Sequence, residues 1–267
     1  MAEIALTQTP VHLRHGSNIG QPLTRRDGVL KVTGAAKYAA DHHPAGMLYA
    51  VLAVSSIVRG RVAFLNIAAA KAHPGVVEVL TPANRPALAG DPDEKSNPLM
   101  FRLDLLQNDR VRYAGQPIAV VVAETLEAAT EGATLIAPRY EIEPARVGLD
   151  AGESFVPQAV GPGFPAEAHR GDVEAGLCAA TRTIAATYET AAQYHNPMEP
   201  HAIVAQWNGD TLSIDTPSQG LAMAQGRLAG LFGMPPDKIH IRSPFLGGGF
   251  GCKGTDLRFS APSPPGW

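Results

Sequence analysis

The sequence has little of several features that mark common protein classes. It contains only two cysteines, Cys178 and Cys252, 74 positions apart, so neither a disulfide framework nor a cysteine zinc site is supported. The net charge of −3 and the pI near 6.3 offer no basic stripe for phosphate groups, which argues against nucleic-acid partners. No apolar run approaches the roughly 20 residues of a membrane span, and the N-terminus lacks the basic and apolar regions of a signal peptide. We expect a soluble, cytoplasmic protein with reduced thiols and no membrane span.

What the chain does contain is typical of a globular protein with many turns. Its 267 residues are 45% hydrophobic and 18% charged, which excludes wholesale disorder and suits one large domain or two modest ones. The 27 glycines and 23 prolines make up nearly a fifth of the chain, above the usual share of about 12%. The composition therefore predicts short elements separated by many turns.

The first region alternates strands with short helices. Residues 1–21 show no sustained period and are interpreted as an N-terminal arm, and residues 22–146 form the first α+β region. Within that region strands are predicted at 29–38, 47–53, 76–79, 118–122 and 139–142, helices at 67–72 and 125–136, and a long surface loop at 86–98. The valine-rich run at 118–122 is expected to be the buried strand.

A stretch rich in glycine, proline and alanine at 147–167 is interpreted as a linker to the second region at 168–254. There, Asp172 is placed to N-cap a short helix that buries Cys178, and a hairpin is expected around Asn208-Gly209, a dipeptide that suits a type I′ turn. The other predicted elements are strands at 183–190 and 239–241 and a helix at 221–232 that stops at Gly233.

A glycine tract follows the last predicted strand and is the first candidate for chemistry. Glycines 247, 248, 249 and 251 place unhindered backbone amides side by side, which lets the chain approach an anionic or oxo group. The tract also matches GxGxxG at 249–254, but a dinucleotide site needs an acid about 20 residues later, and only 13 residues follow Gly254. The alternative interpretation is a flexible turn.

Three further groups of residues could carry chemistry, each with a structural alternative. His195, Glu199 and His201 could ligate a metal or exchange protons, but the intervening prolines preclude the helix of an H-E-x-x-H site, and a rigid bend is the alternative. Gln219 lies at a helix start, where capping is the usual explanation. Cys252 lies beside Lys253 and is a candidate low-pKa thiol, although no partner base is identifiable.

An ordered series of short motifs runs through nearly all of residues 22–254. The motifs are Arg26-Asp-Gly28, Lys31-Val-Thr-Gly34, Tyr38-Ala-Ala-Asp41, Gly46-Met-Leu-Tyr49, Tyr113-Ala-Gly-Gln-Pro117, Arg170-Gly-Asp172, Asn196-Pro-Met-Glu-Pro200 and Gly247-Gly-Gly-Phe-Gly251. Together they resemble the molybdenum-binding large subunit of the xanthine dehydrogenase and aldehyde oxidase family. The resemblance implies an α+β protein with a hammerhead-type α/β domain at 22–146 and the first part of a molybdopterin-binding α+β domain at 168–254, followed by an atypical tail at 255–267.

The resemblance also implies a cofactor and the residues that hold it. Gln219 would place its amide near an oxo ligand of molybdenum, and Phe250 would lie at the same metal with its backbone. Gly248, Gly249 and Gly251 would complete the cofactor-binding tract. The cofactor would be molybdenum-molybdopterin, with the cytosine dinucleotide form as one alternative. No catalytic base is identified, because in the family that glutamate follows the glycine tract.

By the same resemblance, the reaction would hydroxylate an aldehyde or an N-heterocycle such as a purine and pass electrons to 2Fe-2S and FAD groups. The chain has no cysteine pattern for such clusters, so iron-sulfur and FAD subunits are expected as partners, and an export signal on one of them would make the complex periplasmic. Gly254, where xanthine-type members have glutamate, resembles the aldehyde-oxidising branch. Since family subunits are considerably longer, we expect a fragment. It is either one part of a hydroxylase that a second chain completes, or a non-catalytic remnant or assembly module without cofactor.

Overall fold

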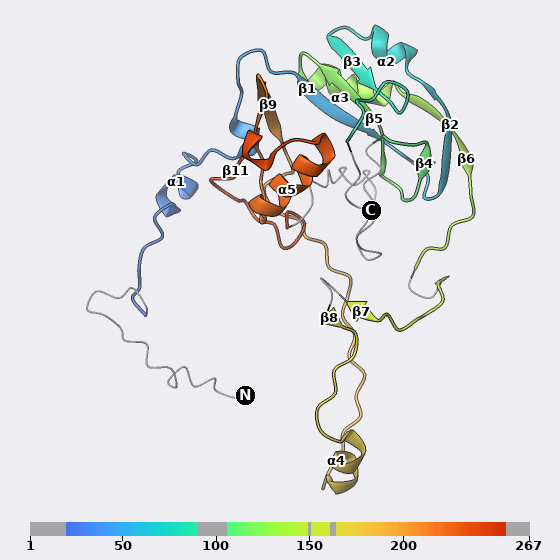
Figure 1. Ribbon diagram of the computed structural model, residues 1–267, viewed down its shortest axis with the longest axis vertical. Coiled ribbons are helices and arrows are strands. Elements are labelled where there is room, and N and C mark those ends of the chain that lie inside the picture. Colours follow the sequence, from blue (N-terminus) through green and yellow to red (C-terminus); the bar gives the residue numbers. More distant parts are fainter. Residues whose placement is uncertain (1–19, 90–105, 149–150, 161–163, 255–267) are drawn as a thin grey trace.

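The computed structural model describes residues 20–89, 106–148, 151–160 and 164–254 (Figure 1). Residues 47–142 form a first body and residues 199–254 form a second body. Between them, the segment that carries β7 (Ala159–Val160), β8 (Phe164–Pro165) and α4 (Val173–Ala179) extends away as an arm. The mixture of helices with largely antiparallel sheets confirms the α+β class. No helix in the described ranges is long and apolar enough to cross a membrane.

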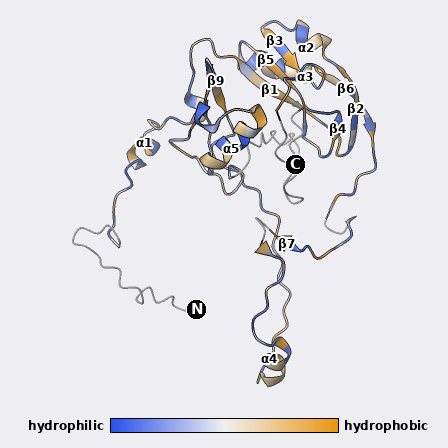
Figure 2. Cartoon of the chain, in the orientation of Figure 1, coloured by the Kyte–Doolittle hydropathy of each residue, from blue (hydrophilic) through white to orange (hydrophobic). Residues whose placement is uncertain are grey.

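The first body is built around β5 (Pro117–Ala123), which lies between β1 (Tyr49–Val54) and β3 (Val76–Leu80) in an antiparallel sheet. Most side chains of β5 are buried because helices α2 (Ala68–Ala72) and α3 (Leu126–Thr134) pack on this sheet. Thr125 caps α3 by accepting a hydrogen bond from the Ala128 amide at 3.1 Å. Figure 2 shows hydrophobic residues gathered on these strands.

A second antiparallel sheet shares the core of the first body. Its order is β4 (Arg110–Val111), β2 (Gly60–Asn66) and β6 (Ala137–Ile142). One continuous cluster of buried side chains joins the two sheets and includes Val79, Val111, Val121 and Ile136. The first body therefore has a core of its own.

Gly60, at the start of β2, occupies a position that only glycine fits. Its φ is 148°, and a Cβ there would lie 2.1 Å from the backbone oxygen of Glu141 on β6. Because that oxygen belongs to the sheet backbone, we expect Gly60→Ala to lower the free energy of unfolding by about 2 kcal/mol. The matched control is Gly226→Ala, where an added Cβ meets nothing within 4 Å, and it should raise that free energy by about 0.5–1 kcal/mol. Urea denaturation of both variants checks the result, and equal effects would exclude a steric role for Gly60.

The second body is a three-stranded sheet covered on one face by a helix. Strands β9 (Val204–Asn208) and β10 (Thr211–Asp215) form an antiparallel hairpin, and β11 (Ile239–Arg242) runs parallel to β10. Helix α5 (Leu221–Phe232) packs Leu228 and Ala229 against Leu212, Ile214 and Ile239 of the sheet. It ends at Gly233, whose left-handed φ of 63° closes the helix, and the 3-10 turn Pro236–Lys238 leads into β11.

Two short segments from earlier in the chain contact this second body. The ring of Tyr38 lies 5.9 Å from the ring of Phe245, and the Lys31 ammonium lies 5.9 Å from the centre of the same ring. The Ala89 amide donates a hydrogen bond of 2.9 Å to the carbonyl of Leu231 on α5. Residues that precede the first body, and one from a loop of the first body, therefore pack against the second body.

Most predicted elements are confirmed: they are β1, α2, β3, β5, α3, β6, α5, β11, the hairpin β9–β10, and helix α4 (Val173–Ala179) with its cap Asp172. The strand predicted at 29–38 is wrong. That segment forms α1 (Gly28–Val32) and then the 3-10 turn Ala39–Asp41, in which the Asp41 carboxylate accepts a bond from the Tyr38 amide at 2.9 Å. Local backbone bonds satisfy this segment, and no described strand lies beside it to pair with.

The strand predicted at 183–190 is also wrong, because these residues form no strand and pair with no other strand of the described chain. Cys178 was expected to be buried, yet it is exposed, since α4 lies at the far end of the arm and buries no residue (Figure 1). The hairpin loop is Gly209-Asp210 rather than Asn208-Gly209. A type I′ turn needs positive φ at both central residues, and only Gly209 has it, at 62°.

Other predicted segments lie partly or wholly outside the described residues. They are the arm at 1–21, the loop at 86–98 and the tail at 255–267. In the predicted linker at 147–167, the described residues include a minimal strand pair, β7 (Ala159–Val160) with β8 (Phe164–Pro165).

Candidate functional site

The glycine tract after β11 is fixed on both flanks by hydrogen bonds to other segments. At one end, the Gly247 amide donates to the Glu199 carboxylate at 2.8 Å, and the Glu199 amide donates to the Gly247 carbonyl at 2.9 Å. At the other end, the Gly251 amide donates to the side-chain oxygen of Gln219 at 3.0 Å, and the Gln219 amide donates to the Lys253 carbonyl at 2.6 Å. The tract is therefore held in one shape rather than left as a free turn.

Between these anchors, three consecutive backbone amides have no partner among the described residues. Gly248, Gly249 and Phe250 donate to no described residue, although Gly249 is buried. Gly248 has a φ of 93° and Phe250 a φ of 53°, a left-handed value that a residue with a side chain rarely adopts. Successive amides in such conformations form a concave anion-binding nest, and buried unpaired amides are rare unless a ligand meets them. The tract therefore offers backbone donors to a hydrogen-bond acceptor.

Gln219 adds a fourth donor beside the tract. Because the Gly251 amide must donate, the atom that faces it is the side-chain oxygen of Gln219. The side-chain NH₂ then points elsewhere, and no described residue accepts a bond from it. A Cβ added at Gly249 would lie 2.3 Å from this oxygen, so the close approach depends on glycine. Capping is not the role of Gln219, since α5 begins after Gly220 with no side-chain cap.

A buried ion pair lies directly behind the tract. The Lys253 ammonium is completely buried and donates to the Glu199 backbone carbonyl at 2.8 Å and to its carboxylate at 3.1 Å. The other carboxylate oxygen of Glu199 is buried and has no hydrogen-bond partner in the described chain. This pair joins the loop around residue 199 to the glycine tract, 54 positions later.

Sequence reasoning missed this pair. It considered Glu199 only with the two histidines and Lys253 only as a neighbour of Cys252. In the structure the Cys252 thiol donates to the Gly249 carbonyl at 2.9 Å, while the Lys253 ammonium donates its hydrogen bonds to Glu199. The only local signal was a lysine inside a glycine-rich tract that matches no phosphate loop, together with a glutamate between prolines.

The two candidate histidines lie near the tract without forming a metal centre. His195 approaches Gly251, since a Cβ there would lie 3.6 Å from its ring nitrogen. No three His, Cys, Asp or Glu side chains among the described residues are grouped closely enough to hold a metal ion. The loop from residue 195 to 201 therefore acts through its glutamate, which anchors the tract.

His201 gives this loop a pH dependence. Burial, with the nearby charge of Lys253, lowers the pKa of His201 below its ordinary value of 6.5, although Glu199 opposes the shift. The unfolded chain therefore binds a proton on this ring more readily than the folded chain, so stability should fall as the pH drops below 6.5 and stop falling below the folded pKa. Urea unfolding at about pH 7.5 and about pH 5.5 checks this. His201→Gln should lose less stability between the two pH values, and an identical loss would contradict the assignment.

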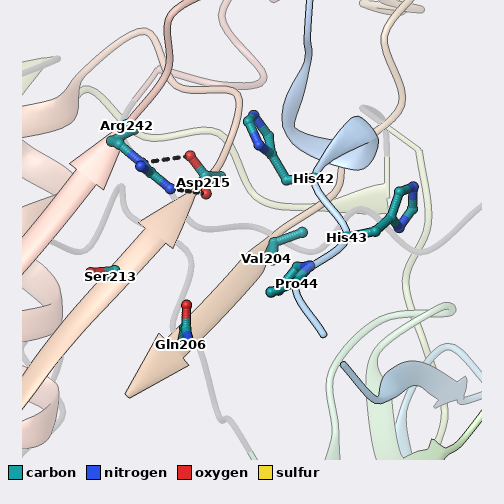
Figure 3. Close-up of a pocket in the computed structure, with 8 residues that line it drawn as sticks. All are labelled: His42, His43, Pro44, Val204, Gln206, Ser213, Asp215 and Arg242. Carbon is teal, nitrogen blue, oxygen red and sulfur yellow. Dashed lines mark hydrogen bonds and ion pairs between the residues drawn. The ribbon is translucent and has the colours of Figure 1, made fainter. Parts of the chain in front are cut away.

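Two cavities flank the second body. One, of about 250 Å³, lies between the His42–Pro44 segment and the polar face of the sheet, where Arg242 forms a bidentate ion pair with Asp215 at 2.6 and 2.8 Å (Figure 3). The other, of about 590 Å³, is lined by β1, the start of β9, His201 and Lys253. Neither contains the free amides of the tract, so we place the candidate site at Gln219 and the tract.

Comparison with known proteins identifies the two bodies. Residues 33–144 match the family model for the aldehyde oxidase and xanthine dehydrogenase a/b hammerhead domain, and residues 157–262 match the model for the molybdopterin cofactor-binding domain. The chain belongs to the aldehyde oxidase and xanthine dehydrogenase family. Its second body, with the free amides of the glycine tract, lies in the molybdopterin-binding part of that family.

Several relatives match along most of this chain. It is 35% identical to the aldehyde oxidoreductase molybdenum-binding subunit PaoC of Escherichia coli K12, covering 88% of this chain and 31% of that subunit. It is 30% identical to the nicotinate dehydrogenase large molybdopterin subunit of Eubacterium barkeri, covering 88% of this chain and 55% of that one. The structure of quinoline 2-oxidoreductase from Pseudomonas putida 86 aligns with a TM-score of 0.68 at 27% identity, over 86% of this chain and 31% of that chain. The chain thus spans about a third of the E. coli subunit.

Proposed function

We propose that this chain is part of the molybdenum-binding subunit of a hydroxylase, and that the glycine tract and Gln219 hold its molybdopterin cofactor. The observation that supports the proposal is a set of three consecutive amides, at Gly248, Gly249 and Phe250, that donate to no described residue, one of them on a buried residue, beside a Gln219 NH₂ that no described residue accepts. All four groups are hydrogen-bond donors in the same tract or directly beside it. Gly251 completes the tract by fixing the orientation of Gln219.

These donors fit the chemistry of the group. A molybdenum-molybdopterin cofactor presents oxo, phosphate and carbonyl oxygens, which accept hydrogen bonds from amides, and the bare glycines leave room for it. When bound, the cofactor supplies the oxidation chemistry for hydroxylation. Gln219 and the backbone of Phe250 would donate at the metal end, and Gly248, Gly249 and Gly251 would shape the tract around the cofactor. The Glu199–Lys253 pair would hold this tract in position.

The substrate class follows from the relatives and one residue. The names of the relatives specify an aldehyde, nicotinate and quinoline, so we infer an aldehyde or N-heterocycle as substrate, and Gly254 favours an aldehyde. Electrons would leave through iron-sulfur and FAD subunits. We infer a cytoplasmic complex, or a periplasmic one if a partner carries the export signal, and a cofactor in its plain or cytosine dinucleotide form. We also propose a domain division at 22–146 and 168–254, with a linker at 147–167.

The alternative, a non-catalytic remnant or assembly module, would need a surface that is closed and polar. Instead, every residue from 171 to 196 is exposed, including large apolar side chains such as Ile184 and Tyr188. Such a surface favours a body that further polypeptide covers over one that is closed by itself. It supports the hydroxylase proposal over the independent module.

Molybdenum and pterin analysis of the purified protein tests the proposal. The chain is expressed alone and with the part of the E. coli PaoC subunit that lies beyond the matched region. We expect close to one molybdenum and one pterin per chain in the co-expressed sample, and a loss of both when Gly249→Val fills the space beside Gln219. Absence of metal and pterin from both samples would reject the proposal and support the remnant.

A further inference from the structure

We propose that Tyr38 and Lys31 are positioning residues for the glycine tract, which they hold through the ring of Phe245. The inference rests on the proposed function for what the tract binds, and it adds residues that lie outside the tract. Tyr38 and Lys31 belong to two motifs near the start of the first region, Lys31-Val-Thr-Gly34 and Tyr38-Ala-Ala-Asp41, for which the proposed function gives no role.

The four residues that join β11 to the tract depend on side-chain contacts for their shape. This connector, residues 243–246, follows β11 and precedes Gly247. No backbone amide of the connector donates to a described backbone group. Instead, the Ser243 hydroxyl accepts a hydrogen bond from the Ser218 amide at 3.2 Å, and Phe245 is half-buried. Side chains, rather than a sheet or a helix, therefore set the direction in which the chain enters the tract.

Two groups from the segment before the first body meet the ring of Phe245. The ring of Tyr38 is inclined by 51° to it with 5.9 Å between the ring centres, a geometry within the range of attractive aromatic pairs. The Lys31 ammonium lies 5.9 Å from the same ring centre, a distance at which the face of an aromatic ring attracts a cation. Because both groups come from a distant part of the sequence, their contacts fix Phe245 relative to a separate segment of the chain.

The backbone that carries Tyr38 is itself fixed. The Tyr38 amide donates a hydrogen bond to the Asp41 carboxylate at 2.9 Å, and the Asp41 amide donates to the Tyr38 carbonyl at 3.0 Å. These two bonds close residues 38–41 into a tight turn. Ala36 and Ala39, on either side of Tyr38, are buried. The ring of Tyr38 is therefore presented to Phe245 from a firm base.

The same segment follows the second body beyond this contact. Figure 1 shows α1 and the chain after it running beside the second body before β1 begins. Lys31 lies in the last turn of α1, where Asp27 pairs with its ammonium at 3.4 Å and 22% of its side chain is exposed. Figure 3 shows the residues from His42 to Pro44 opposite β9 and β10 across the smaller cavity. The contact with Phe245 is therefore part of a longer packed interface.

A shift of Phe245 would reach the tract within two residues. The Gly247 amide donates to the Glu199 carboxylate at 2.8 Å, and the Gly251 amide donates to the Gln219 side chain at 3.0 Å. Both bonds require the tract to start at the right place and in the right direction. Loss of the ring contacts should therefore loosen these two amides while the sheet of the second body stays closed.

Hydrogen–deuterium exchange of the full chain, resolved by residue with NMR, tests the inference without any cofactor. Tyr38→Ala should speed exchange of the Gly247 and Gly251 amides about tenfold, while the amides between β10 and β11 change less than about twofold. Tyr38→Phe keeps the ring and should leave all these amides within about twofold of the unsubstituted chain. Lys31→Met should speed the two glycine amides about threefold.

Three results would each overturn the proposal. They are unchanged glycine amides in Tyr38→Ala, equal acceleration of tract and sheet amides in that variant, and a Tyr38→Phe variant that behaves like Tyr38→Ala. Trp207→Ala is the matched control, because it removes a ring contact on the same body, 6.1 Å from the ring of Phe232 at the end of α5. It should leave the two glycine amides within about twofold, and a tenfold acceleration there would also overturn the proposal.

Pterin content separates this inference from the proposed function. In the sample co-expressed with the PaoC polypeptide, Tyr38→Ala should hold about threefold less pterin than the unsubstituted chain, because the tract is no longer held in position. Tyr38→Phe should hold nearly as much as the unsubstituted chain. Absence of pterin from every sample, with the exchange results as expected, would reject the proposed function alone. Full pterin content in Tyr38→Ala would reject the positioning role alone.

Discussion

Lys253→Met should lower the free energy of unfolding by about 3–5 kcal/mol, because it leaves the Glu199 carboxylate buried without its cation. The Lys253 side chain is fully buried and that of Glu199 is 7% exposed, so water cannot take over the two bonds that the ammonium donates. One oxygen of Glu199 has no partner among the described residues, so the ammonium is the main group that compensates the carboxylate charge. Urea denaturation measures the change.

The control is the same substitution at an exposed ion pair. Lys238 bonds to Asp210 at 3.0 Å with 42% of its side chain exposed, and Lys238→Met should lower the free energy of unfolding far less than Lys253→Met does. Adding Glu199→Gln to Lys253→Met should recover part of the loss, since the buried charge is gone. The buried pair does not hold the tract if both lysine variants lose equally little free energy of unfolding. The same conclusion follows if the double variant is less stable than the sum of the single variants predicts.

Elements with their own local signals could be predicted from the sequence. The run at 118–122 is apolar over several residues and forms the central strand β5, because neighbouring strands and a helix cover it. Thr125 and Gly233 mark the start of α3 and the end of α5 through bonds within a few residues of each position. Such signals depend only on neighbouring residues, so no tertiary information was needed.

The incorrect predictions concern segments whose structure depends on distant partners. The pattern at 183–190 specifies a strand, but a strand also requires pairing, and no described residue provides it. At 29–38 the apolar Val29 and Val32 are three apart, which also suits a turn of helix, and local bonds formed α1. Alternation alone could not distinguish these outcomes.

The candidate site could likewise be predicted only where the sequence carries a local motif. The family resemblance indicated Gln219 and the glycine tract together, and the structure brings the Gln219 oxygen within 3.0 Å of the Gly251 amide. Which amides remain free could not be read from the sequence, because that depends on Glu199 and Gln219 satisfying the flanking ones. The Glu199–Lys253 pair had no local pattern, since 54 positions separate the two residues.

Gln219→Glu should lower the turnover of the completed enzyme about 100-fold, because it removes one hydrogen-bond donor from the reacting centre. The carboxylate can still accept the bond from the Gly251 amide, so the tract keeps its shape. The lost group is the free NH₂, and a negative charge replaces it where the proposed cofactor presents oxygen atoms. The free energy of unfolding should change by less than about 0.5 kcal/mol, since Gln219 is exposed in this chain.

The control is Gln206→Glu, which makes the same change on β9 at the cavity beside Arg242, away from the tract. It should leave turnover unchanged. Steady-state kinetics, molybdenum content and urea denaturation of both variants separate the explanations. Full turnover in Gln219→Glu with normal molybdenum content would contradict a role for this donor at the cofactor. A matching loss of stability in Gln219→Glu would instead show that the added charge disturbs the tract itself, and the lower turnover would then not identify a donor at the cofactor.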